Sequence, residues 1–178
     1  YYFKNKPAII RKNRNSVAVL TGMETKEELI LLGEDIFRYF GLGCRNVSKL
    51  FVPKNYSFDL FFEAMFEYKD VIQYEKYINN YDYNKSIYLV NGEEHLDNGF
   101  LLLKESKELV SPISVLFYEV YNNVESLALG LSEINEKIQC IVSKDAWFEG
   151  SFSFGQAQCP ALEDYADGID TVNFLINL

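Results

Sequence analysis

The sequence predicts an α/β domain with a mostly parallel layered sheet flanked by helices. Its 178 residues, 48% of them hydrophobic, are enough to bury one sizeable core. Short continuous apolar runs, which suit strands buried on both faces, alternate along the chain with segments of helical periodicity. This alternation is typical of strand–helix–strand units, and no internal repeat or low-complexity tract divides the chain.

The first predicted unit is a strand, a helix and a second strand. Residues 16–20 form an apolar run that predicts a buried strand. Thr25 and Glu28 have the spacing of a capping box, so a helix is expected to begin there. Gly41 is expected to end this helix, and residues 49–52 form the second strand. The predicted buried face of the helix consists of Leu29, Leu32, Ile36 and Phe40.

The later elements follow from similar patterns. The polar and aromatic segment 79–84 predicts a loop, and Asn123 is a predicted helix cap. The expected helices span residues 57–68, 71–78 and 123–134, and the expected strands span 87–90, 100–103, 114–121, 138–142 and 170–178.

Cys44 has the surroundings that best suggest chemistry. It follows the glycine-containing turn at residues 41–43 and precedes an apolar strand, a position that suits a nucleophile. Amides exposed at such a turn can stabilise a thiolate and an oxyanion, and Arg45 could lower the pKa of the thiol if its side chain turns inward. Free cysteine is also among the most buried residue types, so the pattern alone fits a core thiol equally well.

The run Gly-Leu-Gly-Cys-Arg-Asn-Val-Ser-Lys-Leu-Phe-Val at residues 41–52 resembles the nucleophile signature of aldehyde dehydrogenases, G-Q-x-C-x-x-x-x-R-x-x-V. Lys49 occupies the basic position and Val52 the closing valine. The residue sequence of this run is most similar to that of acyl-CoA reductases of the LuxC type. These enzymes carry an acyl group on cysteine as a thioester and reduce it to the aldehyde with NADPH. The resemblance therefore implies that Cys44 is the catalytic nucleophile of an aldehyde dehydrogenase-like catalytic domain.

Two further stretches keep the order of that family. Glu-Leu-Val-Ser-Pro-Ile, which begins at Glu108, resembles E-x-F-G-P-[IV], whose glutamate holds the nicotinamide ribose. Glu108 is therefore the implied cofactor-binding residue. Ser-Phe-Gly-Gln at residues 153–156, followed by segments 162–165 and 170–172, resembles the closing P-F-G-G … L-x-x-Y … K-x-V segment. This similarity implies that Phe154 and Gly155 line the substrate pocket.

Enzymes of this family have a dinucleotide-binding half before the cysteine. Here 43 residues precede Cys44, and no G-x-G-x-x-G follows a predicted strand. We therefore expect residues 1–178 to be the catalytic domain alone, with NADPH bound mainly by an N-terminal half absent from this chain. That half is also expected to supply the second oxyanion donor beside the Cys44 N–H. The isolated chain is then expected to be inactive.

The expected reaction is the NADPH-dependent reduction of a long-chain fatty acyl-CoA to the aldehyde. The general-base glutamate of the hydrolytic family members falls here on Ile10, which disfavours water activation and hence an aldehyde-oxidising enzyme. The alternatives are an aldehyde-oxidising NAD(P)-dependent dehydrogenase and a non-catalytic assembly module. Arg11, Lys12 and Arg14 could meet a coenzyme phosphate or could form a solvated basic loop.

Composition limits the partners. A net charge of −9 without a basic stripe argues against nucleic acid, and no apolar run suggests a membrane span. The absence of a signal-peptide pattern and the three scattered cysteines favour a cytoplasmic protein. His95 lacks a second ligand, so no metal is expected. Cys140 is read as a core residue and Cys159 as a spare thiol, and the C-terminal strand makes a homo-oligomer plausible.

Overall fold

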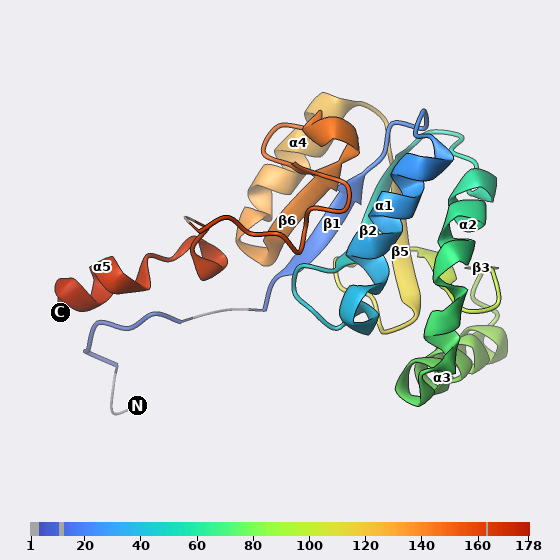
Figure 1. Cartoon of the computed structure of the whole chain (residues 1–178), viewed down its shortest axis with the longest axis horizontal. Coiled ribbons are helices and arrows are strands. Elements are labelled where there is room, and N and C mark those ends of the chain that lie inside the picture. The colour runs from blue at the N-terminus through green and yellow to red at the C-terminus, as the bar shows by residue number, and fades with distance from the viewer. Residues whose placement is uncertain (1–3, 11–12, 163) are drawn as a thin grey trace.

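The computed structural model describes residues 4–10, 13–162 and 164–178, and its centre is a seven-stranded sheet (Figure 1). The strand order is β3-β4-β5-β2-β1-β6-β7, and only the β3–β4 pair is antiparallel. The expected α/β class with a mostly parallel layered sheet is confirmed. The strands are β1 (Asn15–Val19), β2 (Val47–Pro53), β3 (Leu96–Asp97), β4 (Leu102–Glu105), β5 (Val115–Tyr121), β6 (Ile138–Ser143) and β7 (Phe152–Ser153).

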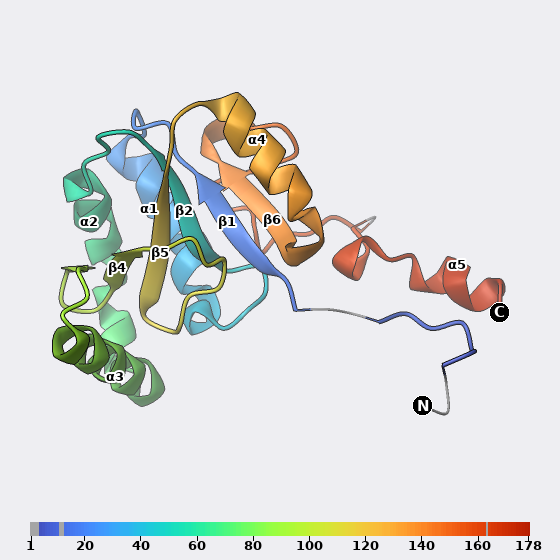
Figure 2. The same ribbon diagram turned by 180° about the vertical axis from the view of Figure 1, so that it is seen from behind.

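Helices cover both faces of the sheet, because alternate residues of each central strand point to opposite sides. On one face, α1 (Lys26–Phe37) and α2 (Asp59–Met65) pack against residues such as Leu50 and Leu116. On the other face, α3 (Glu75–Asn91) covers β4 and β5, and α4 (Val124–Glu133) lies in front of β1 and β6 (Figure 2). In the part of the chain that the structure describes, no helix is long and apolar enough to cross a membrane.

The predicted start of α1 is confirmed and its predicted end is wrong. Thr25 and Glu28 form the expected capping box. The helix ends at Phe37, before Gly41, and the 3₁₀ turn Arg38–Gly41 follows, in which Tyr39 and Phe40 have left-handed backbones with φ of 53° and 60°. Phe40 therefore leaves the helix face on which it was expected. Its ring stacks on Tyr74 at 3.9 Å between centroids, a contact that favours this strained turn.

The expectations of a loop at residues 79–84 and a strand at residues 87–90 are both wrong, because α3 runs through both segments. Its buried residues Tyr77, Tyr81, Asn84 and Tyr88 recur every three or four positions, as helical packing requires. Polar residues that suggested a loop instead donate hydrogen bonds to backbone carbonyls within and beside the helix. The Asn84 Nδ2 group, for example, donates to Asn80 O at 2.9 Å and to Ile113 O at 3.0 Å.

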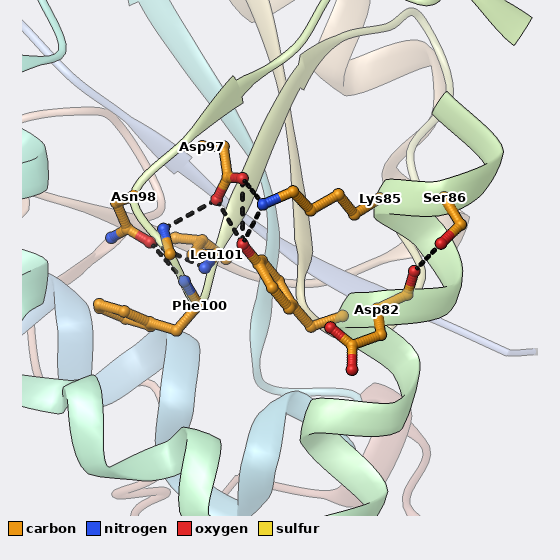
Figure 3. Close-up of polar contacts among 9 residues, drawn as sticks. Asp82, Lys85, Ser86, Asp97, Asn98, Phe100 and Leu101 are labelled. Carbon is orange, nitrogen blue, oxygen red and sulfur yellow. Dashed lines mark hydrogen bonds and ion pairs between the residues drawn. The ribbon is translucent and has the colours of Figure 1, made fainter. Parts of the chain in front are cut away.

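A polar cluster attaches α3 to the strands beside it (Figure 3). The Asp97 carboxylate accepts hydrogen bonds from Tyr81 Oη at 2.8 Å and Gly99 N at 2.8 Å, and Lys85 Nζ lies 2.7 Å away. Burial of Asp97 acts against ionisation, but Lys85, Gly99 and Tyr81 together outweigh it and hold the pKa of this carboxyl below its usual value. The ion pair and hydrogen bonds of this cluster therefore hold α3 over the β3–β4 edge.

The predicted C-terminal strand at residues 170–178 is also wrong. This segment forms helix α5 (Thr171–Ile176), which lies apart from the sheet in Figure 1. Asp170 caps it by accepting a hydrogen bond from Asn173 N at 2.8 Å. The segment that was expected to pair across a subunit boundary is therefore helical, and the homo-oligomer stays a prediction.

Candidate active site around Cys44

Cys44 lies in the turn between the end of the 3₁₀ segment and β2, at the amino ends of the parallel strands. Its side chain is exposed. Cys140, on β6, is buried as expected, and Cys159 is exposed. The structure therefore separates one thiol at a strand end from one enclosed in the sheet.

Asn46 fixes the turn from within. Its buried side-chain amide donates to two carbonyls at the end of α1, Asp35 O at 3.0 Å and Arg38 O at 2.8 Å, and makes a longer contact with Ile36 O. Its Oδ1 accepts from Gly43 N at 2.8 Å. One side chain thus satisfies helix-end carbonyls that lack intrahelical partners and ties them to the residue before Cys44.

Ser16 fixes the turn from the side of β1. Its hydroxyl donates to Cys44 O at 3.0 Å and accepts from Cys140 N at 3.1 Å. Ser16 is fully buried. Within the described residues, no acceptor is bound by the Cys44 N–H itself. The backbone at Cys44 is therefore held while one of its donors stays available.

A second loop is clamped against this turn. The Asp35 carboxylate, in α1, accepts from Gly155 N at 2.7 Å and Ala157 N at 3.0 Å. Burial raises the pKa of Asp35 to about 6, and the two N–H groups only partly offset it. Arg45 turns inward, as Cys44 activation would require, but its guanidinium donates to Cys140 Sγ at 3.3 Å and Ala157 O at 3.0 Å. Burial raises the pKa of the Cys140 thiol despite this contact.

Phe154 and Gly155 belong to this clamped loop. Phe154 is buried in the core beneath α1 rather than open to solvent. Gly155 has a φ of 78°, and a Cβ there would meet Leu31 of α1 at 3.4 Å, so glycine suits both the backbone and the close approach. The structure thus attaches this predicted segment to α1, the helix that precedes the Cys44 turn.

Glu108 lies in the loop between β4 and β5, and its side chain is exposed. The loop is attached to β2 because Ser48 Oγ donates to Leu109 O at 3.0 Å. A small hollow of about 50 Å³ lies between the Cys44 turn and this loop, lined among others by Gly43, Asn46 and Pro112. The Pro112 end of the second predicted motif therefore lies near the Cys44 turn, whereas neither Glu108 nor Cys44 itself lines the hollow.

Sequence reasoning missed the groups that hold the site, namely Ser16, Asp35, Asn46 and Ser48. A signal existed for Asp35, which is a carboxylate on the predicted apolar face of a helix. Asn46 follows a predicted helix end and a glycine turn, where an amide can satisfy free carbonyls.

The other sequence candidates do not join this site. His95 is half-buried, with its Nδ1 2.8 Å from Glu93 O. Arg14 donates to Asn135 O at 3.2 Å, and Arg11 and Lys12 lie outside the described residues. Ile10 is exposed. Across residues 4–10, 13–162 and 164–178, no three His, Cys, Asp or Glu residues gather as a metal site would need.

Comparison with known proteins finds no matching family model and no matching curated protein. Solved structures do match. One is the P. syringae indole-3-acetaldehyde dehydrogenase AldA, as a cysteine-to-alanine mutant in complex with NAD+ and IAA, with a TM-score of 0.52 and 9% identity over 82% of this chain. Another is Staphylococcus aureus AldH in its substrate-bound state, with a TM-score of 0.39 and 14% identity over 94% of this chain. The chain spans 36% and 38% of their lengths. The AldA match shows that the fold is aldehyde dehydrogenase-like.

Proposed function

We propose that this chain carries the acyl-accepting thiol of an NADPH-dependent acyl-CoA reductase, with Cys44 as the nucleophile. The observation that carries the proposal is a turn whose backbone is fixed by the buried Ser16 and Asn46, while its thiol is left exposed. Cys140 shows the opposite arrangement, a thiol enclosed in the sheet. A fixed backbone with an open thiol suits covalent catalysis rather than packing. The aldehyde dehydrogenase-like fold supports this class of chemistry by analogy.

In the proposed first step, Cys44 Sγ, as thiolate, attacks the carbonyl carbon of an acyl-CoA thioester. The new C–S bond forms at Cys44 as the C–S bond to coenzyme A breaks, and the departing coenzyme A thiolate takes its proton from solvent. Negative charge develops on the carbonyl oxygen in between. The Cys44 N–H binds no described acceptor, so it is available to donate to that oxygen.

A nicotinamide cofactor, when bound, would supply the hydride that reduces the thioester. The exposed Glu108 carboxylate fits a role in holding it, because it can accept charge-assisted hydrogen bonds from ribose hydroxyls, and its loop is attached to β2 through Ser48. Because the Phe154 ring is buried in the core, we propose that the backbone of Phe154 and Gly155, and not the ring, forms part of the substrate wall. We also propose that a separate dinucleotide-binding domain holds most of NADPH, since the sequence contains no G-x-G-x-x-G.

The proposal is tested by intact-mass spectrometry after mixing the protein with a long-chain acyl-CoA. The expected result is one added acyl mass that neutral hydroxylamine removes. The adduct should persist in Cys159→Ala, which removes the other exposed thiol, and should be absent in Cys44→Ala.

An adduct that persists in Cys44→Ala would contradict the assignment of the nucleophile. No adduct on the wild-type protein, although iodoacetamide labels Cys44, would favour the non-catalytic module. Reduction of NAD(P)+ on adding an aldehyde to the assembled enzyme would favour the aldehyde-oxidising alternative.

A further inference from the structure

A pocket of about 310 Å³ opens beside β2 and β5, on the face of the sheet that α4 partly covers (Figure 2). Its volume is at the lower end of the range typical of small-molecule sites. Cys44 does not line it, so the pocket is separate from the candidate active site. Its apolar wall comes from the sheet, from the loop after β4 and from α4, and includes Phe51, Leu109, Leu127 and Leu131.

Lys49 contributes a buried charge to this pocket. Its side chain is 2% exposed, although lysine is almost never buried so completely. In the part of the chain that the structure describes, its ammonium donates one hydrogen bond, to Glu119 Oε2 at 2.5 Å. An ammonium has three N–H donors, so two of them have no acceptor among the described residues. Because a buried ion pair often fails to repay the cost of removing its charges from water, this lysine calls for a role other than packing.

Gly130 keeps the pocket open on the side of α4. It lies in the interior of this helix, and a Cβ there would meet no described atom within 4 Å. Glycine destabilises a helix interior relative to alanine, and neither a left-handed backbone nor a close neighbour requires it at this position. The missing side chain leaves free volume at the wall of the pocket.

The charges of the pocket indicate the ligand. Lys49 and Lys107 against Glu119 leave a formal excess of one positive charge, in a chain whose net charge is −9. A cation would be repelled, and a neutral molecule would leave buried N–H groups of Lys49 unused. The Glu119 side chain is 38% exposed, so it can turn to solvent and yield its place on the ammonium.

We propose that this pocket binds a small monocarboxylate with an apolar body. Its carboxylate accepts hydrogen bonds from Lys49 Nζ, and its apolar body packs on Leu127 and Leu131 in the space that Gly130 leaves free. The site does not depend on the role of Cys44, which lies outside the pocket.

The test titrates the 178-residue chain with sodium octanoate, below its micelle concentration. The ¹H–¹⁵N signals of Leu127 and Leu131 locate the binding and give its Kd. Octan-1-ol is the uncharged analogue and octylammonium the cationic one. We expect saturable octanoate binding about tenfold tighter than that of octanol, because only the carboxylate forms a charge-assisted hydrogen bond with Lys49. Octylammonium should not bind.

Four variants test the contacts. Lys49→Met should weaken octanoate binding at least about tenfold and leave octanol binding within about twofold. Glu119→Gln should have the opposite effect and tighten octanoate binding about tenfold, because it removes the internal competitor for the ammonium. Gly130→Leu fills the pocket and should abolish the binding of both ligands. Ser132→Leu, at an exposed position of the same helix, is the matched control and should bind as wild type does.

Equal affinities for octanoate and octanol would overturn the inference, as would octanoate binding that Lys49→Met leaves unchanged, because the binding would then be purely apolar. Octanoate binding that persists in Gly130→Leu would place the ligand elsewhere and overturn it as well. Absence of saturable octanoate binding would have the same consequence. None of these measurements involves acylation of Cys44, so a failure here is distinguishable from a failure of the proposed function.

Discussion

Replacing Asn46 by alanine should cost about 3–4 kcal/mol of folding free energy, a large fraction of the stability of a domain this size. The buried Asn46 side chain makes three good hydrogen bonds, to Arg38 O at 2.8 Å, to Asp35 O at 3.0 Å and from Gly43 N at 2.8 Å. Alanine leaves all three backbone groups without this partner, and each loss costs roughly 1–1.5 kcal/mol.

The assay is urea unfolding followed through the fluorescence of Trp147, the single tryptophan. With a slope of about 2 kcal/mol per molar urea, the midpoint of Asn46→Ala should fall by roughly 1.5–2 M at an unchanged slope. Asn46→Asp should be no more stable than Asn46→Ala: its carboxylate can still accept from Gly43 N, but its second oxygen would face the helix-end carbonyls without a proton to donate. Asn79→Ala, at an exposed position of α3, is the control and should stay within about 0.5 kcal/mol of wild type. A loss below about 1 kcal/mol in Asn46→Ala would refute the reasoning.

Three further predictions concern Asp35, the Lys49–Glu119 ion pair and Gly43. Because burial raises the pKa of Asp35 from 3.8 to about 6, its stabilising contribution is complete below about pH 4 and is lost as the pH rises through 6. Between pH 4 and 7, the urea stability of wild type should therefore fall by up to about 3 kcal/mol relative to Asp35→Asn; parallel pH profiles would contradict this. Glu119→Gln removes the charge 2.5 Å from the buried Lys49 ammonium and should cost about 2 kcal/mol in thermal unfolding. The double variant Glu119→Gln/Lys49→Met should regain most of this stability. No recovery would contradict the explanation that the loss comes from an unpaired buried charge on Lys49. Gly43→Ala places a methyl group 2.8 Å from Asn46 Oδ1 and should cost about 1–2 kcal/mol in thermal unfolding. The control is Gly130→Ala, which should cost nothing, because a Cβ there meets no atom within 4 Å.

Local signals predicted the parts of the fold whose stabilising contacts are close in sequence. The capping box at Thr25 and Glu28 begins α1, and Asn123 caps α4 by accepting from Ser126 N at 2.7 Å. The long helix α3 was missed because its polar face resembles a loop and its short apolar run resembles a strand. What makes it helical is the burial of four residues at helical spacing, of which Tyr81 and Tyr88 pack against β4 and β5. This is a tertiary effect that local propensity does not contain.

The same distinction holds for the site. Cys44 could be singled out from its own turn and motif, but the groups that hold the turn act on distant backbone. Asp35 binds Gly155 N across 120 residues of sequence, and Arg45 binds Ala157 O across 112. Both partners are backbone atoms, which carry no sequence signature. The contacts that hold the site are therefore tertiary, and the sequence alone does not predict them.

The fold also explains why chemistry is expected at the amino edge of this sheet. Open α/β sheets usually bind ligands at the carboxyl ends of strands, at the point where the strand order reverses, here between β1 and β6. In this chain the loop amides at the carboxyl end of β1 are already bound by a side chain from the same loop. The buried Glu24 carboxylate accepts from Thr21 N at 2.5 Å and from Gly22 N at 2.9 Å. An anionic ligand would have to displace Glu24 to reach these amides. At the opposite edge the Cys44 N–H binds no described acceptor, so one donor for a developing negative charge remains available there.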